Sequence, residues 1–533
     1  MAKKETERFV KEETERLAKE RTEEFVKGEM ERLRKGRTEG LIKGCLGELV
    51  KGDGEDLGRN LALFSYHFVG VGGIGMSAIA QVLKEQGHTV SGSDRNYDKH
   101  ITPYVFSKLL SQGISLHPQD GSGVNENTHF IVISSAIEEE NPDIKKARLL
   151  NKKIIKRANL LAEIFNHKYG IAIGGTNGKT TVSSMVSYIL DYANLSPTII
   201  IGGCIKNYVD KVHLGNAKTG TSDIIAIEAD ESDGSIVSYT PQTSVITNVS
   251  KDHNTIEEIS KMFVTLSENT RKLLILNADC PHLRTIHFKH KNIVTYGLHN
   301  GAALSAKNIT YKPFQTLFDV NGQSFEIHLP GSYNVSNALA AIAVARSLNI
   351  PDSKTSVALK QFRGIQRRMD SIGEVHGIRV IDDYAHNPEK VKAAIQAVKL
   401  HYKRIIAIFQ PHGYGPANFM KEELVEAFVT ALSSQDILFM PEIYYAGGTA
   451  SKNISSADII QQVSKAGKKA FFIEKRDDII PIIEGQTHEG DCILVMGARD
   501  YTLTEFCEKI LQGLIQKKML KNYSIQEMKQ NRI

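Results

Sequence analysis

The residues best suited to chemistry form a glycine-rich turn that ends in a lysine and a threonine. The stretch IAIGGTNGKTTVSS (171–184) runs from apolar residues through Gly175 to Lys179 and Thr180. It is one residue shorter than the common phosphate loop, Gly-x₄-Gly-Lys-Ser/Thr. Its backbone amides can nevertheless surround phosphate oxygens, Lys179 can neutralise phosphate charge and Thr180 can bind Mg²⁺. The stretch therefore predicts a site for a nucleotide triphosphate.

Two later stretches end in acidic and histidine side chains. DIIAIEADESDGS (223–235) reads as a buried strand that delivers Glu231, and SVITNVSKDHNT (244–255) reads as another that ends at His253. Mg²⁺ prefers one or two carboxylates together with phosphate oxygens. A single acidic cluster is usually a solvated turn. The order of phosphate loop, acidic strand and histidine strand instead favours a magnesium site beside the nucleotide.

A second glycine pattern begins near residue 66. YHFVGVGGIGMSAIAQVLKEQGHTVSGSD contains Gly70, Gly72 and Gly75 in a G-x-G-x-x-G arrangement, and Asp94 ends the next expected strand. Glycines at these positions let the backbone approach a diphosphate at the start of a helix. The pattern alone suggests a dinucleotide-binding Rossmann domain, and its diphosphate can be that of NAD or of a UDP-sugar, so a dehydrogenase also has to be considered.

The elements that must position these residues are those of an α/β protein. Expected strands at 129–137 and 152–156 continue the first unit to about residue 166, and strand–loop–helix patterns continue after it. A chain of 533 residues predicts three to four units. We therefore expect parallel sheets with the ligand groups at the carboxyl ends of their strands.

Composition excludes several classes of protein. Hydrophobic residues make up 41% and charged residues 24% of the chain, and the net charge is +5 without a dense basic block, so charge gives no support for nucleic-acid binding. Five scattered cysteines without a Cys-x-x-Cys pair suit a reducing compartment. No stretch is long and apolar enough to span a membrane. These features predict a soluble, multidomain, cytoplasmic protein without stable membrane insertion.

The first 60 residues differ from the rest, because TERFVK, TERLAK, TEEFVK and related segments recur every eight residues. Helix formers predominate, but an eight-residue step turns the apolar positions around the helix axis, which argues against a heptad coiled coil. Basic and acidic residues balance at 15 each over 1–60. We expect a charged repeat tail without a catalytic role; a docking or oligomerising helix is the alternative.

Taken together, these motifs resemble those of the Mur ligase family. The resemblance rests on GVGGIGMS (70–77), SSAI (134–137), GTNGKTT (175–181), EADESD (228–233), TN…DH (247–253) and DDYAH (382–386), and it covers roughly 65–510. It implies three α/β domains after the tail of 1–60. These are a Rossmann-like UDP-sugar domain (61–167), a central P-loop ATPase domain (168–364) and a Rossmann-like ligase domain (365–515), followed by a tail (516–533).

The resemblance also implies the residues of each site. The UDP-sugar would be bound by Gly70, Gly72, Gly73, Gly75, Met76, Ser77, Asp94 and Ser135. ATP would be bound by Gly175, Thr176, Asn177, Gly178, Lys179, Thr180, Thr181, Asn334, Asn337 and Asp383. Thr180, Glu231 and His253 would bind Mg²⁺, and Lys179, His253, Arg367 and His386 would be catalytic, with Arg367 and His386 directed to the phosphates.

The implied reaction is ATP-dependent amide formation through an acyl phosphate, with UDP-N-acetylmuramate and an amino acid as substrates. L-Alanine is the first choice of acceptor. Two alternatives stay open: a ligase that adds another amino acid or a peptide to the same nucleotide sugar, and a nucleotide-sugar-binding regulator without turnover.

The third domain departs from the family pattern at several positions. In FQPHGYGP (409–416), Gly413 and Pro416 occupy the positions of two arginines, and GARD (497–500) has Arg499 in place of a glycine. PEIYYAGGTA (441–450) replaces a shorter loop. Replacing arginine with glycine removes five donors and a charge. The acceptor is therefore the least certain part of the prediction, and Arg499 is a candidate replacement cation.

Overall fold

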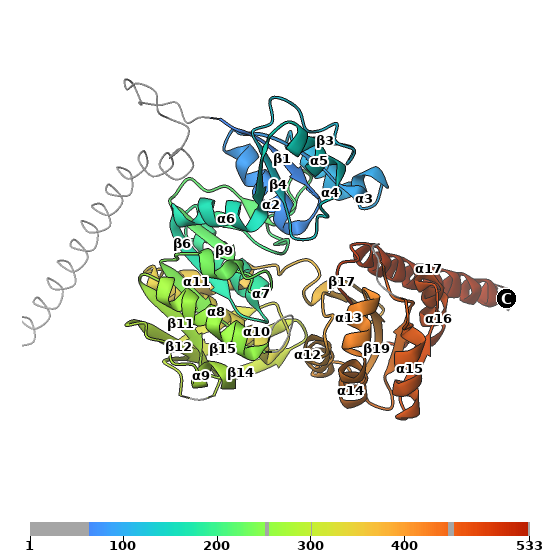
Figure 1. The fold of residues 1–533 in the computed structure, drawn as a ribbon. Helices are drawn as coiled ribbons and strands as arrows, with labels where there is room; N and C mark the ends of the chain where they lie inside the picture. Colours follow the sequence, from blue (N-terminus) through green and yellow to red (C-terminus); the bar gives the residue numbers. More distant parts are fainter. Residues whose placement is uncertain (1–62, 251–254, 300, 446–451, 531–533) are drawn as a thin grey trace, which may run out of the picture.

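We describe a computed structural model of the chain, which covers residues 63–250, 255–299, 301–445 and 452–530 (Figure 1). The repeat tail, its suggested docking role and His253 all lie outside these residues. Three α/β bodies follow one another along the chain, each built on its own sheet. Among the described helices, none is long and apolar enough to cross a bilayer.

The first body is a five-stranded parallel sheet in the order β3-β2-β1-β4-β5. The first helix of this body, α2, starts directly after the glycine turn. The strands are β1 (Ser65–Val69), β2 (Thr89–Ser93), β3 (Ser115–His117), β4 (Phe130–Ile133) and β5 (Lys153–Lys156), and the helices are α2 (Ile74–Glu85), α3 (Arg95–Asp98), α4 (Pro103–Ser111), α5 (Pro142–Leu149) and α6 (Arg157–Asn166). The strand expected over 129–137 is shorter, because the chain turns after Ile133 and the Ile137 amide bonds to the Ser134 carbonyl.

The central body is an eight-stranded sheet in the order β13-β12-β11-β10-β6-β9-β7-β8, in which only β8 is antiparallel to its neighbour. A three-stranded antiparallel sheet, β14-β15-β16, adjoins it. The strands are β6 (Tyr169–Gly174), β7 (Thr198–Ile200), β8 (Ala217–Lys218), β9 (Ile224–Glu228), β10 (Thr243–Ile246), β11 (Leu273–Asn277), β12 (Ile293–Gly297), β13 (Leu304–Ser305), β14 (Lys307–Lys312), β15 (Gln315–Val320) and β16 (Gln323–Ile327). The helices are α7 (Lys179–Tyr192), α8 (Ile256–Asn269), α9 (Pro281–Thr285), α10 (Ser332–Ser347), α11 (Asp352–Gln361) and the 3₁₀ turn η1 (Ser235–Ser238).

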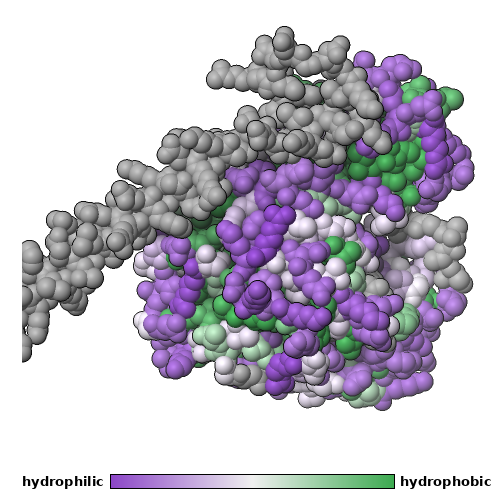
Figure 2. All heavy atoms as spheres, turned by 60° about the vertical axis from the view of Figure 1, so that its left-hand side comes forward, coloured by the Kyte–Doolittle hydropathy of each residue, from purple (hydrophilic) through white to green (hydrophobic). Residues whose placement is uncertain are grey.

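Alternation along the central strands explains how both faces of this sheet are covered. Ile171 and Ile173 of β6 pack with α7, α10 and α11, whereas Ala172 between them belongs to the opposite face, where α8 packs. The core on the α8 side is continuous with the core around α2 of the first body. Burial of apolar surface therefore joins the first two bodies. On the molecular surface, hydrophilic residues predominate on the face shown in Figure 2.

The third body is a six-stranded sheet in the order β17-β18-β22-β19-β20-β21, parallel except for β17. Its strands are β17 (Asp370–Val375), β18 (Ile378–Asp383), β19 (Arg404–Gln410), β20 (Ile437–Met440), β21 (Lys469–Phe472) and β22 (Asp491–Gly497). Helices α12 (Pro388–Lys399), α14 (Lys421–Ala431) and α15 (Ser456–Lys465) pack on one face, and α16 (Ile479–Gln486) and α17 (Leu503–Gln530) on the other. Two short elements, α13 (Tyr414–Phe419) and η2 (Arg476–Asp478), complete it. Helix α17 continues through most of the expected tail 516–533.

Candidate active site

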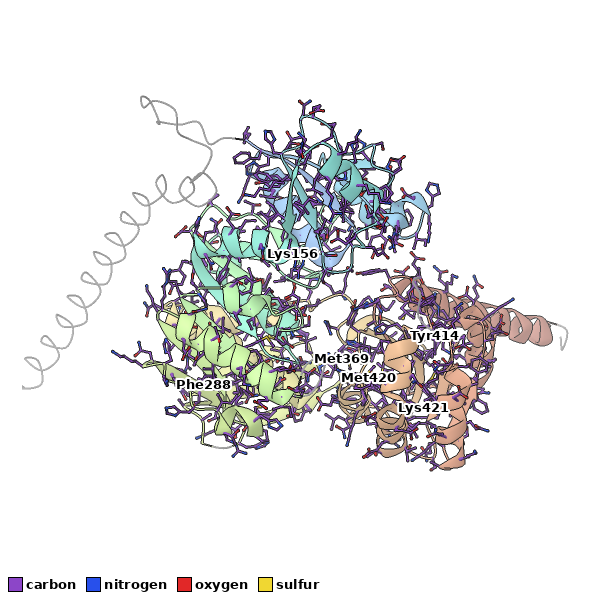
Figure 3. The ribbon with its side chains drawn as sticks, viewed as in Figure 1. Lys156, Phe288, Met369, Tyr414, Met420 and Lys421 are labelled. Carbon is purple, nitrogen blue, oxygen red and sulfur yellow. The ribbon has the colours of Figure 1, made fainter. Side chains whose placement is uncertain are left out.

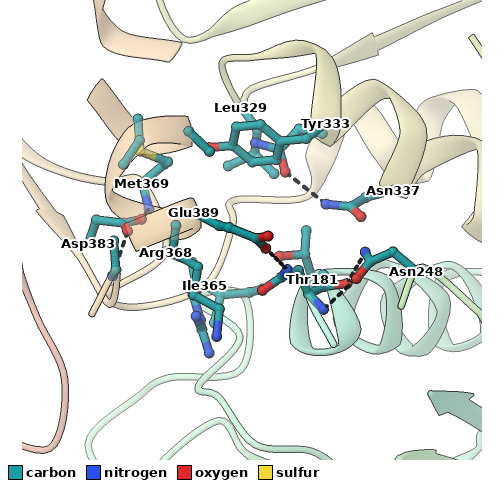
Figure 4. A pocket seen from close by; sticks show the side chains of 17 residues that line it. Thr181, Asn248, Leu329, Tyr333, Asn337, Ile365, Arg368, Met369, Asp383 and Glu389 are labelled. Atoms are coloured by element: carbon teal, nitrogen blue, oxygen red, sulfur yellow. Dashed lines mark hydrogen bonds between the residues drawn. The ribbon is translucent and has the colours of Figure 1, made fainter. Parts of the chain in front are cut away.

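A cavity of about 320 Å³ lies between the central and C-terminal bodies (Figure 4). Its central wall comes from the phosphate loop and the start of α10, and the opposite wall comes from the end of β18 and the start of α12. Met369, which lines it, lies at the junction of the two bodies in Figure 3. Residues far apart in the sequence therefore meet at one pocket.

The compact phosphate loop is closed by contacts that only glycine allows. Gly175 has φ +129°, and a Cβ atom there would lie 2.0 Å from Thr247 Oγ1. Gly178 has φ +87°, and a Cβ atom there would lie 2.7 Å from Asn337 Oδ1. A left-handed backbone and the close neighbours both exclude larger residues. These two glycines therefore let the short loop lead directly into the first turn of α7.

The TN…DH stretch holds the loop from outside. Thr247 Oγ1 donates to the Asn177 carbonyl at 2.6 Å, Asn248 Nδ2 donates to the same carbonyl at 2.8 Å, and the Asn177 amide donates to Asn248 Oδ1 at 2.9 Å. Thr176 exchanges two hydrogen bonds with the backbone of Ser250. The hydroxyl of Thr176 is therefore engaged by protein, and its backbone is the part that remains available for phosphate.

Lys179 lies among carboxylates at the end of β9. Its Nζ is 2.7 Å from Glu231 Oε2 and 3.6 Å from Asp230 Oδ1. Burial alone would lower the pKa of Lys179, but Glu231, Asp230 and Glu228 outweigh burial and raise it. The ammonium group is therefore charged at neutral pH, as phosphate binding requires.

Thr180 meets a different carboxylate from the one expected. Its hydroxyl donates to Glu228 Oε1 at 2.9 Å, and Glu228 Oε2 accepts the Gly202 amide at 2.9 Å. Glu231 instead pairs with Lys179. The nearest protein oxygens to a cation held by Thr180 are thus those of Glu228, the first residue of the EADESD motif, to which the motif gave no role of its own.

The described residues contain no cluster of three or more histidine, cysteine or acidic groups arranged to hold a metal by themselves. A threonine hydroxyl and carboxylates are hard oxygen donors, and Mg²⁺ usually completes its shell with phosphate oxygens and water. The residues present at the loop therefore fit Mg²⁺ bound jointly with a nucleotide.

Asn334 and Asn337, both expected to bind ATP, line the cavity. Asn334 Nδ2 donates to the Pro330 carbonyl at 2.7 Å, and Asn337 Nδ2 donates to Asn334 Oδ1 at 3.2 Å. Tyr333 and Leu329 form a wall beside them (Figure 4). Sequence reasoning missed Tyr333, although an aromatic residue directly before Asn334 at a helix start was a usable signal.

The end of β18 supplies the opposite wall. Asp383 accepts the Met369 amide at 2.7 Å and the Ala385 amide at 2.8 Å, and burial raises its pKa. His386 Nδ1 lies 2.9 Å from the Tyr384 carbonyl. Burial, followed by the positive charge of Lys390, holds the pKa of His386 well below its ordinary value. Imidazole is therefore neutral at physiological pH.

The segment 364–370, called the hinge segment here, joins the central and C-terminal bodies, and Arg367 in it does not lie as expected. The guanidinium of Arg367, the predicted phosphate ligand, is buried inside the C-terminal body, where Nη2 donates to the Gly497 carbonyl at 2.7 Å. Arg368, to which the motifs gave no role, lines the cavity, and its Nη2 lies 3.4 Å from Thr180 Oγ1. The two positions are indistinguishable in sequence because both are arginines in an irregular segment.

The first glycine turn and Asp94 also come together. The Gly72 amide donates to Asp94 Oδ2 at 2.9 Å, and Gly70 has φ +82°. Gly73 and Gly75 lie at the start of α2, and Ser135 is exposed in the turn after β4. The backbone of this turn therefore faces the carboxyl edge of the sheet, where a diphosphate would be bound.

Two predicted ligands of this turn point elsewhere. Met76 is buried in the apolar core. Ser77 is also buried, and its hydroxyl bonds to Asn216 and to the Ile74 carbonyl. A helix that packs on a sheet must bury one side, and these two side chains belong to the buried side of α2.

Three family models match the chain in order. They are the Mur ligase family catalytic domain at 65–169, the Mur ligase middle domain at 173–345 and the Mur ligase glutamate ligase domain at 367–499. Among curated relatives, the UDP-N-acetylmuramate–L-alanine ligase of Pelobacter propionicus is 36% identical over 81% of this chain and 94% of that protein. The enzyme of the same name from Geotalea daltonii is 37% identical over 81% and 94%.

This chain belongs to the Mur ligase family. Among solved structures, UDP-N-acetylmuramate-alanine ligase MurC from Thermotoga maritima aligns with a TM-score of 0.69 at 27% identity, over 86% of this chain and 99% of that one. A murein peptide ligase from Psychrobacter arcticus aligns with a TM-score of 0.63 at 23% identity, over 85% and 98%, which shows a shared fold. The family and the three-domain α/β architecture expected from the motifs are both confirmed.

Proposed function

We propose that this Mur ligase joins L-alanine to the carboxylate of UDP-N-acetylmuramate at the expense of ATP, in peptidoglycan precursor synthesis. The observation that carries the proposal is the cavity between the central and C-terminal bodies, where the phosphate loop faces Arg368 and Asp383. Relatives named for this reaction match over most of their own length. A cytoplasmic location is part of the same proposal.

A free carboxylate is a poor electrophile, so the reaction needs activation. The γ-phosphoryl group passes from ATP to a carboxylate oxygen, giving an acyl phosphate and ADP. The amine then attacks the acyl carbon, the C–O bond breaks, phosphate leaves and a proton is lost from nitrogen. Lys179 and Arg368 supply positive charge beside the phosphates. They would contribute by positioning the phosphates and by neutralising their negative charge.

When bound, Mg²⁺ would neutralise phosphate charge. Thr180 and Glu228 are the residues that would hold it, together with Glu231 if its pairing with Lys179 opens. Each carboxylate oxygen of Asp383 accepts a backbone amide, which fixes the side chain, and Asp383 would orient the nucleotide ribose. Neutral His386 would contact the phosphate side without adding to the positive charge of Lys179 and Arg368.

A peptide or another amino acid as acceptor is the second candidate, favoured by the start of α13. Gly413 and Pro416 stand there in place of two arginines, and the Gly413 amide donates to the Tyr444 carbonyl at 2.9 Å. A charge-assisted hydrogen bond is worth about 1.5–3 kcal/mol, so losing two of them changes what the acceptor site can bind.

The test is phosphate release by the full-length protein with ATP, Mg²⁺ and UDP-N-acetylmuramate, across a panel of amino acids and wall peptides. Release that depends on L-alanine, with the highest kcat/KM in the panel, supports the proposal. A tenfold preference for another acceptor would show that L-alanine is not the substrate, while the proposed ligase reaction would still hold. UDP-N-acetylmuramate binding without turnover for any acceptor indicates a regulator.

A further inference from the structure

One side chain of the central domain makes three hydrogen bonds to the helix that follows the first glycine turn. Asn216, completely buried just before β8, donates from Nδ2 to the Ile74 carbonyl at 2.7 Å and to Ser77 Oγ at 3.0 Å. Its Oδ1 accepts from Gln81 Nε2 at 2.9 Å. All three partners lie on α2, and two of them are in its first turn.

The chemistry of this contact is specific to an amide. Within α2 the Ile74 carbonyl also accepts the Ser77 hydroxyl, and Gln81 Nε2 also donates to the Ser77 carbonyl. Asn216 adds donors and an acceptor to this network from the central domain, because a side-chain amide offers two donors and an acceptor from one planar group. Removing the Asn216 amide takes three hydrogen bonds from this network, which costs stability at a buried contact. The first turn of α2 is therefore held in one place against the central domain by hydrogen bonds as well as by apolar packing.

The backbone around Asn216 continues to the other substrate site. The Asn216 carbonyl accepts the Ile201 amide at 3.0 Å. Gly202, which follows Ile201, donates its amide to Glu228 Oε2 at 2.9 Å. Glu228 in turn accepts the Thr180 hydroxyl. A short series of bonded groups thus links the start of α2 to the threonine of the phosphate loop.

We propose that Asn216 is a positioning residue, which fixes the UDP-sugar turn at a set distance and orientation from the ATP phosphates. The inference rests on the proposed ligase function. Asn216 is completely buried and its side chain bonds to α2, so it acts on the substrates through that helix. Phosphoryl transfer nevertheless requires the sugar carboxylate and the γ-phosphate to meet in line, and a misplacement of about 1 Å can cost on the order of 100-fold in rate.

The alternative is that Asn216 merely satisfies buried polar groups at a domain interface. That role predicts a loss of stability with unchanged kinetics in the folded protein. The positioning role predicts a loss of kcat while each substrate still binds. The two roles therefore differ in measurable quantities.

The experiment compares N216A with Q112A in the full-length protein. Gln112 is a control, because its amide also crosses this interface, donating to the Val212 carbonyl at 2.9 Å. It bonds to α2 at Gln81 Oε1, 3.1 Å away and beyond the first turn, so it tests the interface without the contacts to Ile74 and Ser77. We expect N216A to lower kcat at least tenfold, with the Kd values of UDP-N-acetylmuramate and ATP within threefold of wild type. Q112A should keep kcat within threefold.

A second variant, N216D, gives a measurement that would stay unchanged if Asn216 had only a structural role. In N216D, only the protonated carboxyl group has an O–H to donate to the Ile74 carbonyl, so its kcat relative to wild type should rise as pH falls from 8.5 to 6. This comparison also stands if N216A fails to fold.

Three results overturn the inference: N216A with kcat within threefold of wild type, equal losses of kcat in N216A and Q112A, or a pH-independent ratio in N216D. Wild-type turnover is measured first with the acceptor panel. Absence of turnover with every acceptor overturns the proposed function and with it this inference. Turnover that N216A retains overturns the inference alone.

Discussion

Arg367 and Arg368 are neighbours in the chain, but the side chain of Arg367 is bonded inside the C-terminal body, whereas that of Arg368 reaches the central body. Arg367 donates to the Gly497 carbonyl and lies 3.4 Å from the carboxylate of buried Asp382. Arg368 lies over the Tyr384 ring, 4.6 Å from its centroid, and reaches Thr180 Oγ1 at the phosphate loop. Positive φ angles at Arg367 (+60°) and Met369 (+47°) produce the change of direction.

This arrangement predicts opposite phenotypes for the two arginines. R368A should lower kcat/KM for ATP by about 100-fold, because one charged donor directed at a developing charge is worth roughly 3 kcal/mol, and it should leave stability nearly unchanged. R367A should cost about 3–5 kcal/mol of unfolding free energy, since buried Asp382 would lose its cation and keep the hydrogen bond from the Thr504 hydroxyl. Kinetics and urea unfolding of both variants are the measurements; the reverse pattern would contradict the assignment.

Glu231 should be required for amide formation but not for UDP-sugar binding. E231A removes the closest partner of Lys179 and one of the carboxylates near the phosphates, so we expect turnover to fall at least 100-fold. The Kd of UDP-N-acetylmuramate should stay within threefold, because that ligand binds another domain. Near-normal turnover at ordinary Mg²⁺ would rule out the role, and K179A, expected to behave in the same way, tests the phosphate loop independently.

Tyr333 should contribute to nucleotide affinity through its ring. The ring forms a wall of the cavity (Figure 4), and contact between aromatic faces adds about 0.5–1.5 kcal/mol. Y333A should raise the KM for ATP up to about tenfold. Y333F, which keeps the ring, should stay within twofold. An unchanged KM in Y333A would place the base elsewhere.

His386 should make stability depend on pH. Its ordinary pKa is 6.5, and in the folded protein burial, followed by Lys390, holds the pKa well below that value. As pH falls through about 6.5 the unfolded chain takes up a proton that the folded protein does not, so its stabilising contribution is complete above 6.5 and is lost below it. The unfolding free energy of wild type minus that of H386N should therefore fall by about 1 kcal/mol between pH 7.5 and 5.5. A constant difference would contradict the burial of a neutral imidazole.

Arg499 stands where the family pattern has glycine, and its φ of +61° is left-handed. A residue with a Cβ atom pays about 1–2 kcal/mol there, partly offset by the greater flexibility of glycine in the unfolded chain. R499G should therefore be more stable than R499A by about 0.5–1 kcal/mol in urea unfolding. If Arg499 binds the acceptor carboxylate, both variants should also raise the acceptor KM equally.

Sequence patterns located the parts that depend on backbone shape. Glycines with left-handed φ and strand-end acids are local requirements of a phosphate loop and a parallel sheet, so Gly175, Gly178 and Lys179 are identifiable from the sequence alone. The choice between Glu228 and Glu231 as partner of Thr180 is not. Glu228 ends β9 and Glu231 lies three residues later, and which one meets the hydroxyl depends on how α7 packs against β9.

Contacts between domains were beyond the reach of the sequence for a related reason. Asn216 and Ser77 are 139 positions apart, and nothing in the local pattern of either marks a partner. Ser77 was expected to face a diphosphate because it follows the glycine turn, whereas packing of α2 on the sheet directs its hydroxyl to the central domain. His253 and the repeat of residues 1–60 stay predictions.

The cavity wall that faces the phosphate loop belongs to a body that the hinge segment joins to the central one, and the direct polar contacts between the two include Asn177 with Glu389 and Lys206 with Asp370. A nucleotide seated there is enclosed by both bodies, so its exit requires their separation. The time that ADP stays bound is then set by how long the two bodies stay closed. Solvent viscosity slows the movement of whole domains, so raising the viscosity should lower turnover whenever product release limits the rate.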